Sequence, residues 1–498
     1  MTSFEEFKSR VKQGNVIPVF DTILADTDTP VSVYLKLKDE SPYSFLLESI
    51  EGGEKLARYS FLGYDPFMTF EILGKSFEIK SLHDDVTVLP TLVNHGDDPL
   101  NALRKIFAHF KTVKTEGLPR LSGGAVGFFG YETVQLVEDI PVASKDELGI
   151  PDGLLMFCDT MLIFDNVLNW VFLVSNGYVP APDMTEALVR KEYDKAVAEI
   201  ERLKRILKKD IHAEPAMPHA NGFLEYEITK DEFLAAVQKG KNYIVEGDIF
   251  QVVLSQRLKR KADLPSFDLY RMLRLINPSP YMYYLQLNGF SIIGSSPEML
   301  VRVENGIVET RPIAGTRRRG SSSEEDFRLE EELIHDEKER AEHLMLVDLG
   351  RNDIGRISNA GSVQVTEFMS VERYSHVMHI VSNIRGTLRK ELSPLDALYS
   401  CFPAGTLTGA PKIRAMEIIA ELEPVKRNVY GGAVGYIDFT GNLDSCIAIR
   451  TIVEKDGMLY FQAGAGIVHD SVPEREYEET LEKFGANLKA LDMLMDMR

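Results

Sequence analysis

The chain has 498 residues, of which 44% are hydrophobic and 27% are charged. This composition excludes intrinsic disorder and allows a large buried core. Lys and Arg total 56 against 76 Asp and Glu, which gives a formal net charge of −20. Because contact with a phosphate backbone requires a basic face, we expect no nucleic-acid partner.

The cysteines and the apolar segments bear on where the protein resides. Cys158, Cys401 and Cys446 lack CxxC spacing, so we expect neither a disulfide framework nor a zinc site. The first residues lack the basic and apolar segments of a signal peptide. The most apolar stretch starts at Met161, but Asp165 interrupts it and it is too short to cross a membrane. We therefore expect a soluble, cytoplasmic protein in which this stretch forms a buried strand or hairpin.

The best candidate for a domain boundary lies near the middle of the chain. Before it, short apolar runs such as residues 32–37 and 44–49 favour β-strands between glycine-bearing turns. Residues 184–209 show helical spacing and end in a segment with two prolines and a glycine. We place an N-terminal region at 1–210, a linker at 211–224 and a second domain at 225–498, and both parts are predicted to be α+β.

Two stretches resemble one another: GGAVGFFGY from Gly123 and GGAVGYIDF from Gly431. Each places a pair of glycines before an apolar, aromatic-rich strand. Neither has the lysine of a Walker loop or a GxGxxG pattern. We therefore interpret them as two strands bent over one core and not as phosphate-binding loops.

Two predicted helices each carry a pair of glutamates three residues apart: Glu339 with Glu342, and Glu476 with Glu479. This spacing puts both carboxylates on one helix face, and two such faces that meet would offer the oxygen ligands that Mg²⁺ prefers. For the second pair, a solvated charged face is the simpler interpretation. Glu342 is harder to explain in that way, because it shares its face with apolar residues, where a charge needs a cation or an arginine such as Arg351.

Histidine, arginine and glycine supply further candidates. His376 and His379 have no third metal ligand nearby, so we expect one buried, hydrogen-bonded ring and one exposed ring, although a histidine near a cleft can also move protons. Arg450 lies in an alternating apolar run over 444–453, where it needs a structural aspartate or a substrate carboxylate. Gly464 and Gly466 end a strand with small residues that leave backbone N–H groups open to a ligand.

Read in order, seven segments closely resemble motifs of the chorismate-utilising enzymes. They are PIAGTRRRG from Pro312, EHLMLVDLGRND from Glu342, YSHVMHIVSNIRG from Tyr374, FPAGTLTGAPKIRAM from Phe402, YGGAVGYIDF from Tyr430, SCIAIRT from Ser445 and QAGAGIVHDSVPEREYEET from Gln462. The resemblance implies an α+β fold, a large mixed α/β sandwich of antiparallel sheets flanked by helices. Within the family, the chain is most similar to the branch that turns chorismate and ammonia into anthranilate and pyruvate in tryptophan biosynthesis.

The resemblance implies a magnesium site and a general acid. Glu342 and Glu479 match the ligands of a Mg²⁺ ion on the ring carboxylate of chorismate, with Glu339 and Glu476 as inner or water-mediated neighbours. Glu298, in GSSPEML, matches the acid that protonates the departing hydroxyl group. That task requires a carboxyl group with a raised pKa.

Other positions match catalytic and substrate-binding residues of the family. His379 and Thr316 match catalytic positions, His379 in the proton transfer that accompanies loss of pyruvate, whereas His376 matches no role. The substrate-binding positions correspond to Gly315, Thr316, Tyr430, Arg450, Gly464, Ala465 and Gly466, with Lys483 as a weaker candidate. The resemblance implies that Arg450 and Tyr430 bind the enolpyruvyl carboxylate.

Two positions separate this branch from close relatives. Aminodeoxychorismate synthases typically carry a nucleophilic lysine where this chain has Ala314. Isochorismate and salicylate synthases place a water-activating lysine where this chain has Gln251, and a neutral amide cannot deprotonate water. An aminodeoxychorismate synthase of the folate pathway with a substituted nucleophile stays the alternative function. A catalytically silent amino-acid sensor is an alternative of another class.

The resemblance also implies a partner and an inhibitor. No cysteine has the glycine-flanked surroundings of a glutaminase nucleophile, so the ammonia would come from a separate glutamine amidotransferase subunit. A heterotetramer of two large and two small subunits is expected. In this family the LLES and PSPYM segments line a pocket where L-tryptophan inhibits the enzyme. The resemblance therefore implies that 1–210 is a regulatory region that contributes to this effector pocket and that 225–498 is the chorismate-binding catalytic domain. The matching residues are Leu47, Glu48, Ser49, Pro280, Tyr281 and Met282, although a polar strand end and a proline-ordered turn would explain either segment singly.

Overall fold

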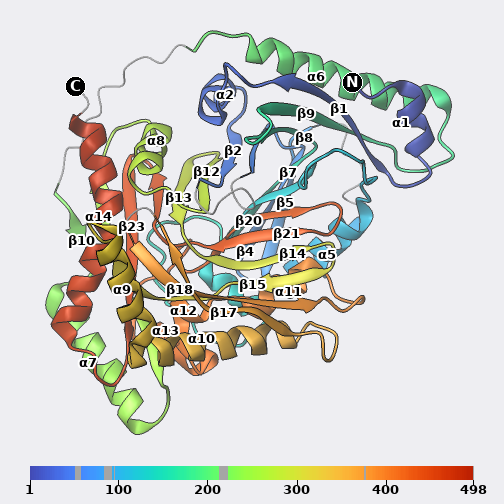
Figure 1. Ribbon diagram of the computed structural model, residues 1–498. Helices are drawn as coiled ribbons and strands as arrows, with labels where there is room; N and C mark the ends of the chain where they lie inside the picture. Colours follow the sequence, from blue (N-terminus) through green and yellow to red (C-terminus); the bar gives the residue numbers. More distant parts are fainter. Residues whose placement is uncertain (51–57, 84–91, 95, 212–222, 375–376, 497–498) are drawn as a thin grey trace.

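Two large antiparallel β-sheets form the centre of the molecule, and helices cover them (Figure 1). The computed structural model describes residues 1–498 except 51–57, 84–91, 95, 212–222, 375–376 and 497–498. The predicted α+β sandwich is confirmed. Most of the predicted linker at 211–224 lies outside the described residues, and so does His376.

The first sheet combines strands from both halves of the sequence. In order across the sheet these are β1 (Val16–Leu24), β9 (Trp170–Tyr178), β8 (Thr160–Asp165), β3 (Tyr59–Tyr64), β2 (Tyr43–Glu48), β12 (Tyr281–Leu287), β13 (Phe290–Ser296), β22 (Thr451–Lys455), β23 (Met458–Ile467), β11 (Gln251–Lys261) and β10 (Glu225–Tyr226), and β19 (Gly409–Ala410) pairs with β11. Because β2 pairs with β12, Glu48 lies opposite Met282 and the two predicted effector segments are neighbours.

The second sheet is also built from both halves. Its order is β16 (Ile313–Arg318), β18 (Val377–Thr387), β15 (Ile307–Thr310), β14 (Met299–Glu304), β21 (Leu443–Ile447), β20 (Ala433–Asp438), β6 (Gly124–Phe129), β7 (Gly153–Cys158), β4 (Met68–Leu73) and β5 (Ser76–Ser81), and β17 (Gln364–Arg373) pairs with β18. Residues 1–210 and 225–498 therefore share both sheets. The regulatory role of the first of these regions stays a prediction.

Helices cover the outer faces and edges of the sheets. They are α1 (Phe4–Arg10), α2 (Pro30–Leu37), α5 (Pro99–His109), α6 (Glu186–Leu207), α7 (Lys230–Glu246), α8 (Ser266–Ile276), α9 (Ser323–His335), α10 (Glu337–Gly355), α11 (Pro394–Cys401), α12 (Gly405–Thr408), α13 (Lys412–Leu422) and α14 (Pro473–Asp496), and a 3₁₀ turn, η1, spans Tyr131–Leu136. Helix α6 packs on β9, α14 on β23, and α10 on β16 and β18 (Figure 1). The two helices with glutamate pairs, α10 and α14, thus border different sheets.

Local signals explain where the sequence predictions held and where one failed. Residues 32–37 lie in α2 and not in a strand, so that prediction was wrong. Thr29 and Ser32 form a reciprocal capping box, and Pro30 occupies the first turn. These start signals outweigh the strand preference of the valines that follow. Residues 44–48 lie in β2, the stretch from Met161 forms the β8–β9 hairpin, and the predicted helix over 184–209 contains α6.

The two similar glycine stretches form neighbouring strands, β6 and β20, as the sequence interpretation expected. They pair antiparallel with Gly127 opposite Gly435. A Cβ atom at Gly127 would lie 1.9 Å from a backbone oxygen of the next strand, and one at Gly435 would lie 2.1 Å from another. Both positions therefore require glycine because backbones approach closely there.

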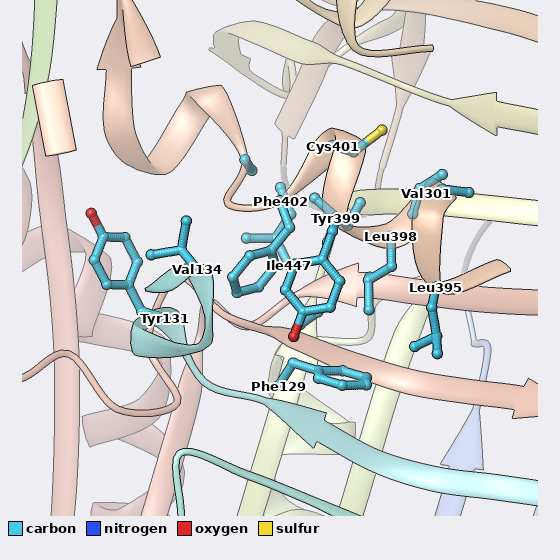
Figure 2. Close-up of a cluster of buried hydrophobic side chains, with 14 of the residues drawn as sticks. Phe129, Tyr131, Val134, Val301, Leu395, Leu398, Tyr399, Cys401, Phe402 and Ile447 are labelled. Atoms are coloured by element: carbon cyan, nitrogen blue, oxygen red, sulfur yellow. The ribbon is translucent and has the colours of Figure 1, made fainter. Parts of the chain in front are cut away.

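A hydrophobic cluster ties the N-terminal half to the C-terminal half. Phe129, at the end of β6, packs edge-on against Tyr399 of α11 with ring centroids 5.9 Å apart, and Tyr399 contacts Phe402 in the same way at 5.5 Å (Figure 2). Tyr131 and Val134 project from η1 beside them. Each fully buried side chain of this size contributes about 1.5–3 kcal/mol to folding. The cluster therefore holds η1 firmly against the C-terminal half.

The structure also bears on the cysteines and on membrane insertion. Cys158, Cys401 and Cys446 are all buried and free. In the part of the chain that the structure describes, no helix combines the length and apolar character needed to cross a bilayer.

Candidate active site

Glu298 and Arg450 lie where the chain crosses between the two sheets. Strand β13 of the first sheet leads through Glu298 into β14 of the second. In the other direction, β21 of the second sheet leads through Arg450 into β22 of the first. The predicted continuous strand over 444–453 was therefore wrong, because the chain turns at Arg450, whose φ is +51°. After this turn the Arg450 side chain reaches α14, where its Nη1 atom donates to the Lys483 carbonyl.

Glu298 is a buried carboxyl group held at a fixed point. Its side chain lines a cavity between α10 and α12, and Thr406 Oγ1 donates a hydrogen bond to Glu298 Oε1 at 3.1 Å. The Ile447 N–H group donates to the Glu298 backbone carbonyl at 3.0 Å. Burial raises the pKa of Glu298 to about 8, against the opposing effects of Thr406 and the Lys483 charge. This carboxyl group is therefore mostly protonated at neutral pH and can donate a proton.

His379 is oriented by a bulge in the neighbouring strand. Thr316 of β16 lies opposite His379 of β18, and the register shifts at Gly315, whose φ is +65°. The Gly315 carbonyl oxygen is 2.9 Å from His379 Nδ1, and Thr316 Oγ1 is 3.1 Å from the same nitrogen. Because a carbonyl only accepts, Nδ1 carries the proton and Nε2 keeps a free lone pair. Burial lowers the pKa of His379, and the nearby Arg450 charge lowers it further.

Arg450 and Tyr430 lie together beside the glycines of β23. Within the described residues, no carboxylate comes within salt-bridge distance of the Arg450 guanidinium, whose Nη1 donates to the Lys483 carbonyl at 2.8 Å. Burial lowers the pKa of Arg450, and the charges of Tyr430 and Glu479 oppose this shift. A Cβ atom at Gly464 would lie 2.8 Å from the Tyr430 hydroxyl oxygen, so the absence of a side chain at this position leaves room for the hydroxyl group.

Lys483 connects α14 to β23. Its Nζ atom is 2.6 Å from Glu479 Oε1 and donates to the Gly464 carbonyl at 2.7 Å. On one side of β23, the pairing with β22 ends at Phe461, so residues 464–466 have no β22 partner there. On the other side, residues 464–466 pair with β11. Gly464, Ala465 and Gly466 thus form a strand segment with one side toward Tyr430 and Lys483.

Glutamates from α10 and α14 come close enough to influence one another. Burial raises the pKa of Glu342, and the charges of Glu339 and Glu479 raise it further. Burial also raises the pKa of Glu476, to which the charge of Glu479 adds. On α14, Glu476 is half-buried, whereas the Glu479 side chain is 46% exposed and pairs with Lys483, as on the charged face that the sequence suggested. Arg351 does not compensate Glu342, because it pairs with Asp348 on the exposed side of the helix.

The donor set fits a divalent cation bound by a small number of carboxylates. Glu339 is 3.2 Å from Arg317 Nη1 and Glu479 pairs with Lys483, whereas Glu342 has Gln251 Nε2 at 3.5 Å as its polar contact. Mutual repulsion among half-buried carboxylates is the condition that a divalent ion relieves. Among the described residues, no three acidic, histidine or cysteine side chains converge closely enough to bind one metal ion. An ion here would therefore complete its coordination with water or substrate oxygens.

The six predicted effector residues line one pocket between the two sheets, with a cavity volume of about 60 Å³. Tyr281 donates its hydroxyl hydrogen bond to Asp444 at 3.0 Å, and Arg302 Nε donates to the same carboxylate at 3.1 Å. Arg120 also lines this pocket. The Glu48 carboxylate accepts hydrogen bonds from Tyr270 and Arg274 of α8, so it already has partners within the fold.

Several polar residues of these sites escaped the sequence analysis. Thr406 and Arg317 lie inside segments quoted for the resemblance, in FPAGTLTGAPK and PIAGTRRRG, which was the available signal. Arg120, Arg302 and Asp444 come from three separate parts of the chain and form a single cluster only after the second sheet assembles. Neither spacing nor periodicity brings them together.

Comparison with known proteins identifies the family. Residues 61–489 match the family described as chorismate binding enzyme. The anthranilate synthase component 1 of Acetivibrio thermocellus is 49% identical, covering 100% of this chain and 99% of the relative, and that of Aquifex aeolicus is 46% identical over 99% and 98%. These matches favour the anthranilate branch over the aminodeoxychorismate alternative.

Similar solved structures are consistent with this family assignment. Anthranilate synthase component I from Streptococcus pneumoniae superposes with a TM-score of 0.74 at 36% identity, covering 93% of this chain and 99% of that one. The menaquinone-specific isochorismate synthase from Escherichia coli, at 17% identity and a TM-score of 0.70, covers 98% and 99% and shares the fold. This chain belongs to the chorismate-binding enzymes and, within them, to the anthranilate synthase component 1 family.

Proposed function

We propose that this enzyme converts chorismate and ammonia to anthranilate, pyruvate and water as part of tryptophan synthesis. The observation that carries the proposal is a set of three complementary groups linked through the charges of Arg450 and Lys483, which act on the pKa values of His379 and Glu298. The three groups are Glu298 with a pKa of about 8, His379 with a free Nε2 lone pair, and the Arg450 cation with no carboxylate in contact among the described residues. Such a set can donate a proton, accept a proton and bind an anion.

Glu298 is the proposed general acid. Ammonia forms a C–N bond at C2 of the ring, the two ring double bonds shift, and the C4–O bond breaks with its electron pair on oxygen, while the added nitrogen loses its extra proton. The carboxyl proton of Glu298 moves to that oxygen, which leaves as water. Thr406, which donates to Glu298 Oε1 at 3.1 Å, leaves the other carboxyl oxygen to carry this proton.

His379 is the proposed group for the second half of the reaction. Aromatisation removes the proton from C2, the bond to the enolpyruvyl oxygen breaks, and the side chain gains a proton on its methylene carbon to leave as pyruvate. The Gly315 carbonyl fixes Nδ1–H, so Nε2 is the nitrogen that can accept and pass on the proton. The lowered pKa of His379 keeps the ring neutral and ready for this role.

Arg450 and Tyr430 are the proposed binding groups for the enolpyruvyl carboxylate. A guanidinium group can hold a carboxylate with two parallel hydrogen bonds, and the Tyr430 hydroxyl group adds a third donor. The glycines of β23 leave room for the substrate beside these donors. Lys483 contributes positive charge nearby, although its Nζ atom is already engaged with Glu479 and Gly464.

Glu342 and Glu479 are the proposed ligands of a Mg²⁺ ion, with Glu339 and Glu476 beside them. When bound, such an ion withdraws electron density from the ring carboxylate and orients the substrate. The proposal is supported by the burial of Glu342 and Glu476, which raises the pKa values of both groups, and by the charge of Glu479, which raises them further. Gln251, at 3.5 Å from Glu342, is a neutral neighbour that does not add to this repulsion.

A separate glutamine amidotransferase subunit is the proposed source of ammonia. The relatives are named component 1, which is consistent with a second component. Burial raises the pKa values of all three cysteines here, so none has the character of a glutaminase nucleophile. A heterotetramer of two large and two small subunits and a cytoplasmic location stay predictions.

Feedback inhibition by L-tryptophan is proposed to act through the pocket lined by the two effector segments. The pocket has apolar walls for an aromatic ring, and Arg120, Arg302 and Asp444 supply charges for an amino-acid backbone. Strand β14 runs from Glu298 toward Arg302, and β21 runs from Asp444 toward Arg450. Two strands therefore connect the pocket directly to the proposed acid and the proposed substrate anchor, which supports coupling between the sites.

The function is tested with the purified chain, chorismate, MgCl₂ and an ammonium salt at alkaline pH, where free ammonia is abundant. We expect anthranilate fluorescence and pyruvate to appear in equal amounts. Glutamine in place of the ammonium salt should give no product until an amidotransferase subunit is added. Formation of aminodeoxychorismate without pyruvate would contradict the proposal.

A further inference from the structure

Turn η1 of the N-terminal half reaches the loop that carries Tyr430. Glu132, in this turn, is 5% exposed. Its Oε1 atom accepts a hydrogen bond from the Arg427 N–H group at 2.8 Å, and its Oε2 atom accepts one from the Asn428 N–H group at 3.0 Å. In return, the Tyr131 N–H group donates to the Asn428 carbonyl at 2.8 Å. Both carboxylate oxygens are thus used to hold the backbone just before Tyr430.

This use of a carboxylate is costly and specific. In the described part of the chain, no cationic side chain pairs with Glu132 within salt-bridge distance, although Lys426, Arg257 and Arg427 lie in the surrounding network. A buried charge without an ion pair is strongly unfavourable unless hydrogen bonds satisfy it. Burial raises the pKa of Glu132 to about 7, and the hydrogen bond from the Arg427 N–H group opposes this rise, so the backbone contact favours the carboxylate form.

The loop itself needs support. Asn428 has a φ of +52°, which is uncommon for a residue with a side chain, and Gly431 has a φ of +74°. A Cβ atom at Gly130, just before η1, would lie 2.8 Å from the Asn428 carbonyl oxygen. The Tyr430 N–H group donates to the Arg427 carbonyl at 3.1 Å, so Tyr430 follows a tight turn that begins at the residue Glu132 holds.

Arg427 extends the contact from the backbone to the Tyr430 ring. Its guanidinium pairs with both oxygens of Glu423 at 2.6–2.8 Å, and it donates to the carbonyls of Leu407 and Val253 at 2.7 and 2.8 Å. It also lies 5.6 Å from the centre of the Tyr430 ring. The Arg427 side chain is therefore fixed by α12, α13 and β11, while Glu132 fixes its backbone.

We propose that Glu132 is a positioning residue through which the N-terminal half sets the place of Tyr430 in the chorismate site. Glu132 orders residues 427–430, and this order keeps the Tyr430 hydroxyl group against Gly464, where the enolpyruvyl carboxylate binds. The inference rests on the substrate-binding role proposed above for Tyr430. It assigns the N-terminal half a part in substrate binding that is independent of any effector.

The test replaces Glu132 with Gln and measures steady-state kinetics with ammonium as the nitrogen source. In the Gln side chain, an NH₂ group replaces one of the two carboxylate oxygens. This NH₂ group would face a backbone N–H group, so the loop loses one strong hydrogen bond. We expect KM for chorismate to rise roughly 10- to 100-fold while kcat changes less than about twofold. This is the pattern expected when an interaction that stabilises the bound substrate and the transition state equally is lost. Glu132→Asp, which keeps the charge, should give a KM between the two.

Glu71→Gln is the matched control. Glu71 is a buried carboxylate of the same half, on β4, paired with Lys80 at 2.8 Å; β4 is distant in its sheet from β16 and β18, and β23 belongs to the other sheet. We expect this variant to be less heat-stable than wild type but to keep the wild-type KM. A KM rise in Glu71→Gln equal to that in Glu132→Gln would overturn the proposal, because it would show a general effect of destabilisation.

A double-mutant cycle separates this proposal from the role of Tyr430. Tyr430→Phe should itself raise KM, and adding Glu132→Gln to it should raise KM little further. If Tyr430→Phe keeps the wild-type KM, the role proposed for Tyr430 fails. If Tyr430→Phe raises KM and Glu132→Gln does not, only the positioning role fails. Should Glu132→Gln not fold, Glu132→Asp is compared with the same controls, and a wild-type KM there overturns the proposal.

Discussion

Replacing Glu298 with Gln tests the proposed general acid through two independent properties. A positioned general acid contributes about 10²- to 10⁴-fold to rate, so we expect kcat to fall by a factor in that range. Because burial places the pKa of Glu298 at about 8, the wild-type enzyme should lose activity as pH rises through that value. Above it, the protonated fraction and the rate fall about tenfold per pH unit.

The same raised pKa predicts how the stability of the variant differs from that of wild type as pH rises. The unfolded chain ionises Glu298 near 4.5, and the folded chain only near 8. Between these values the folded state binds one more proton, so wild-type stability falls by about 1.4 kcal/mol per pH unit from this group. Gln has no such titration. The stability of Glu298→Gln relative to wild type should therefore increase with pH, by roughly 5 kcal/mol in total.

The assay combines kinetics at constant free ammonia with melting temperatures measured from about pH 5 to about pH 9. Glu304→Gln, at an exposed position of β14, is the control and should follow wild type in both. A wild-type rate in Glu298→Gln would refute the acid role. A stability difference that does not vary with pH would refute the raised pKa on which the role depends.

Three further predictions concern the substrate and effector sites. Arg450→Gln should raise KM for chorismate by roughly 100-fold with a smaller effect on kcat in the ammonium assay, because it removes the anchor of one carboxylate. Gly464→Ala should also lower kcat/KM, since its Cβ atom would lie 2.8 Å from the Tyr430 hydroxyl oxygen and 2.9 Å from a backbone oxygen. Ser49→Phe should abolish inhibition by L-tryptophan and leave the uninhibited rate unchanged, as measured by rate against tryptophan concentration, because the added ring fills the pocket.

Each of these three predictions has an outcome that would contradict it. A wild-type KM in Arg450→Gln would remove this arginine from the substrate site. Unchanged kcat/KM in Gly464→Ala would mean that the Tyr430 hydroxyl group need not stay beside β23. Normal tryptophan inhibition in Ser49→Phe would place the effector elsewhere.

Regular helices and motif residues could be predicted from the sequence. The helical spacing over 184–209 corresponds to α6, and both glutamate pairs lie on helices, in α10 and α14. Apolar periodicity is a local property, so it can be recognised in the sequence without knowledge of the fold. The pairing of the two glycine stretches was also foreseeable in part, because their shared GGAVG pattern indicated a shared environment.

The failures have a common physical cause. An alternating run was expected to continue through Arg450, but the chain leaves one sheet at Ile447 and enters the other at Thr451. Alternation cannot reveal such a crossover, because both strands it joins are apolar. Glu132 escaped notice for a related reason. Its partners are backbone N–H groups almost 300 residues away in the chain, and the sequence does not indicate which backbone groups bind a side chain.

The central claim is that glutamates of α10 and α14 meet at the substrate to hold a divalent ion. Titration of the enzyme with Mn²⁺ in the presence of chorismate, followed by electron paramagnetic resonance, measures this binding without relying on turnover. We predict that Glu342→Gln and Glu479→Gln each weaken Mn²⁺ binding at least about tenfold, whereas Glu337→Gln, at an exposed position of α10, binds like wild type. Wild-type affinity in both Glu342→Gln and Glu479→Gln would contradict the claim.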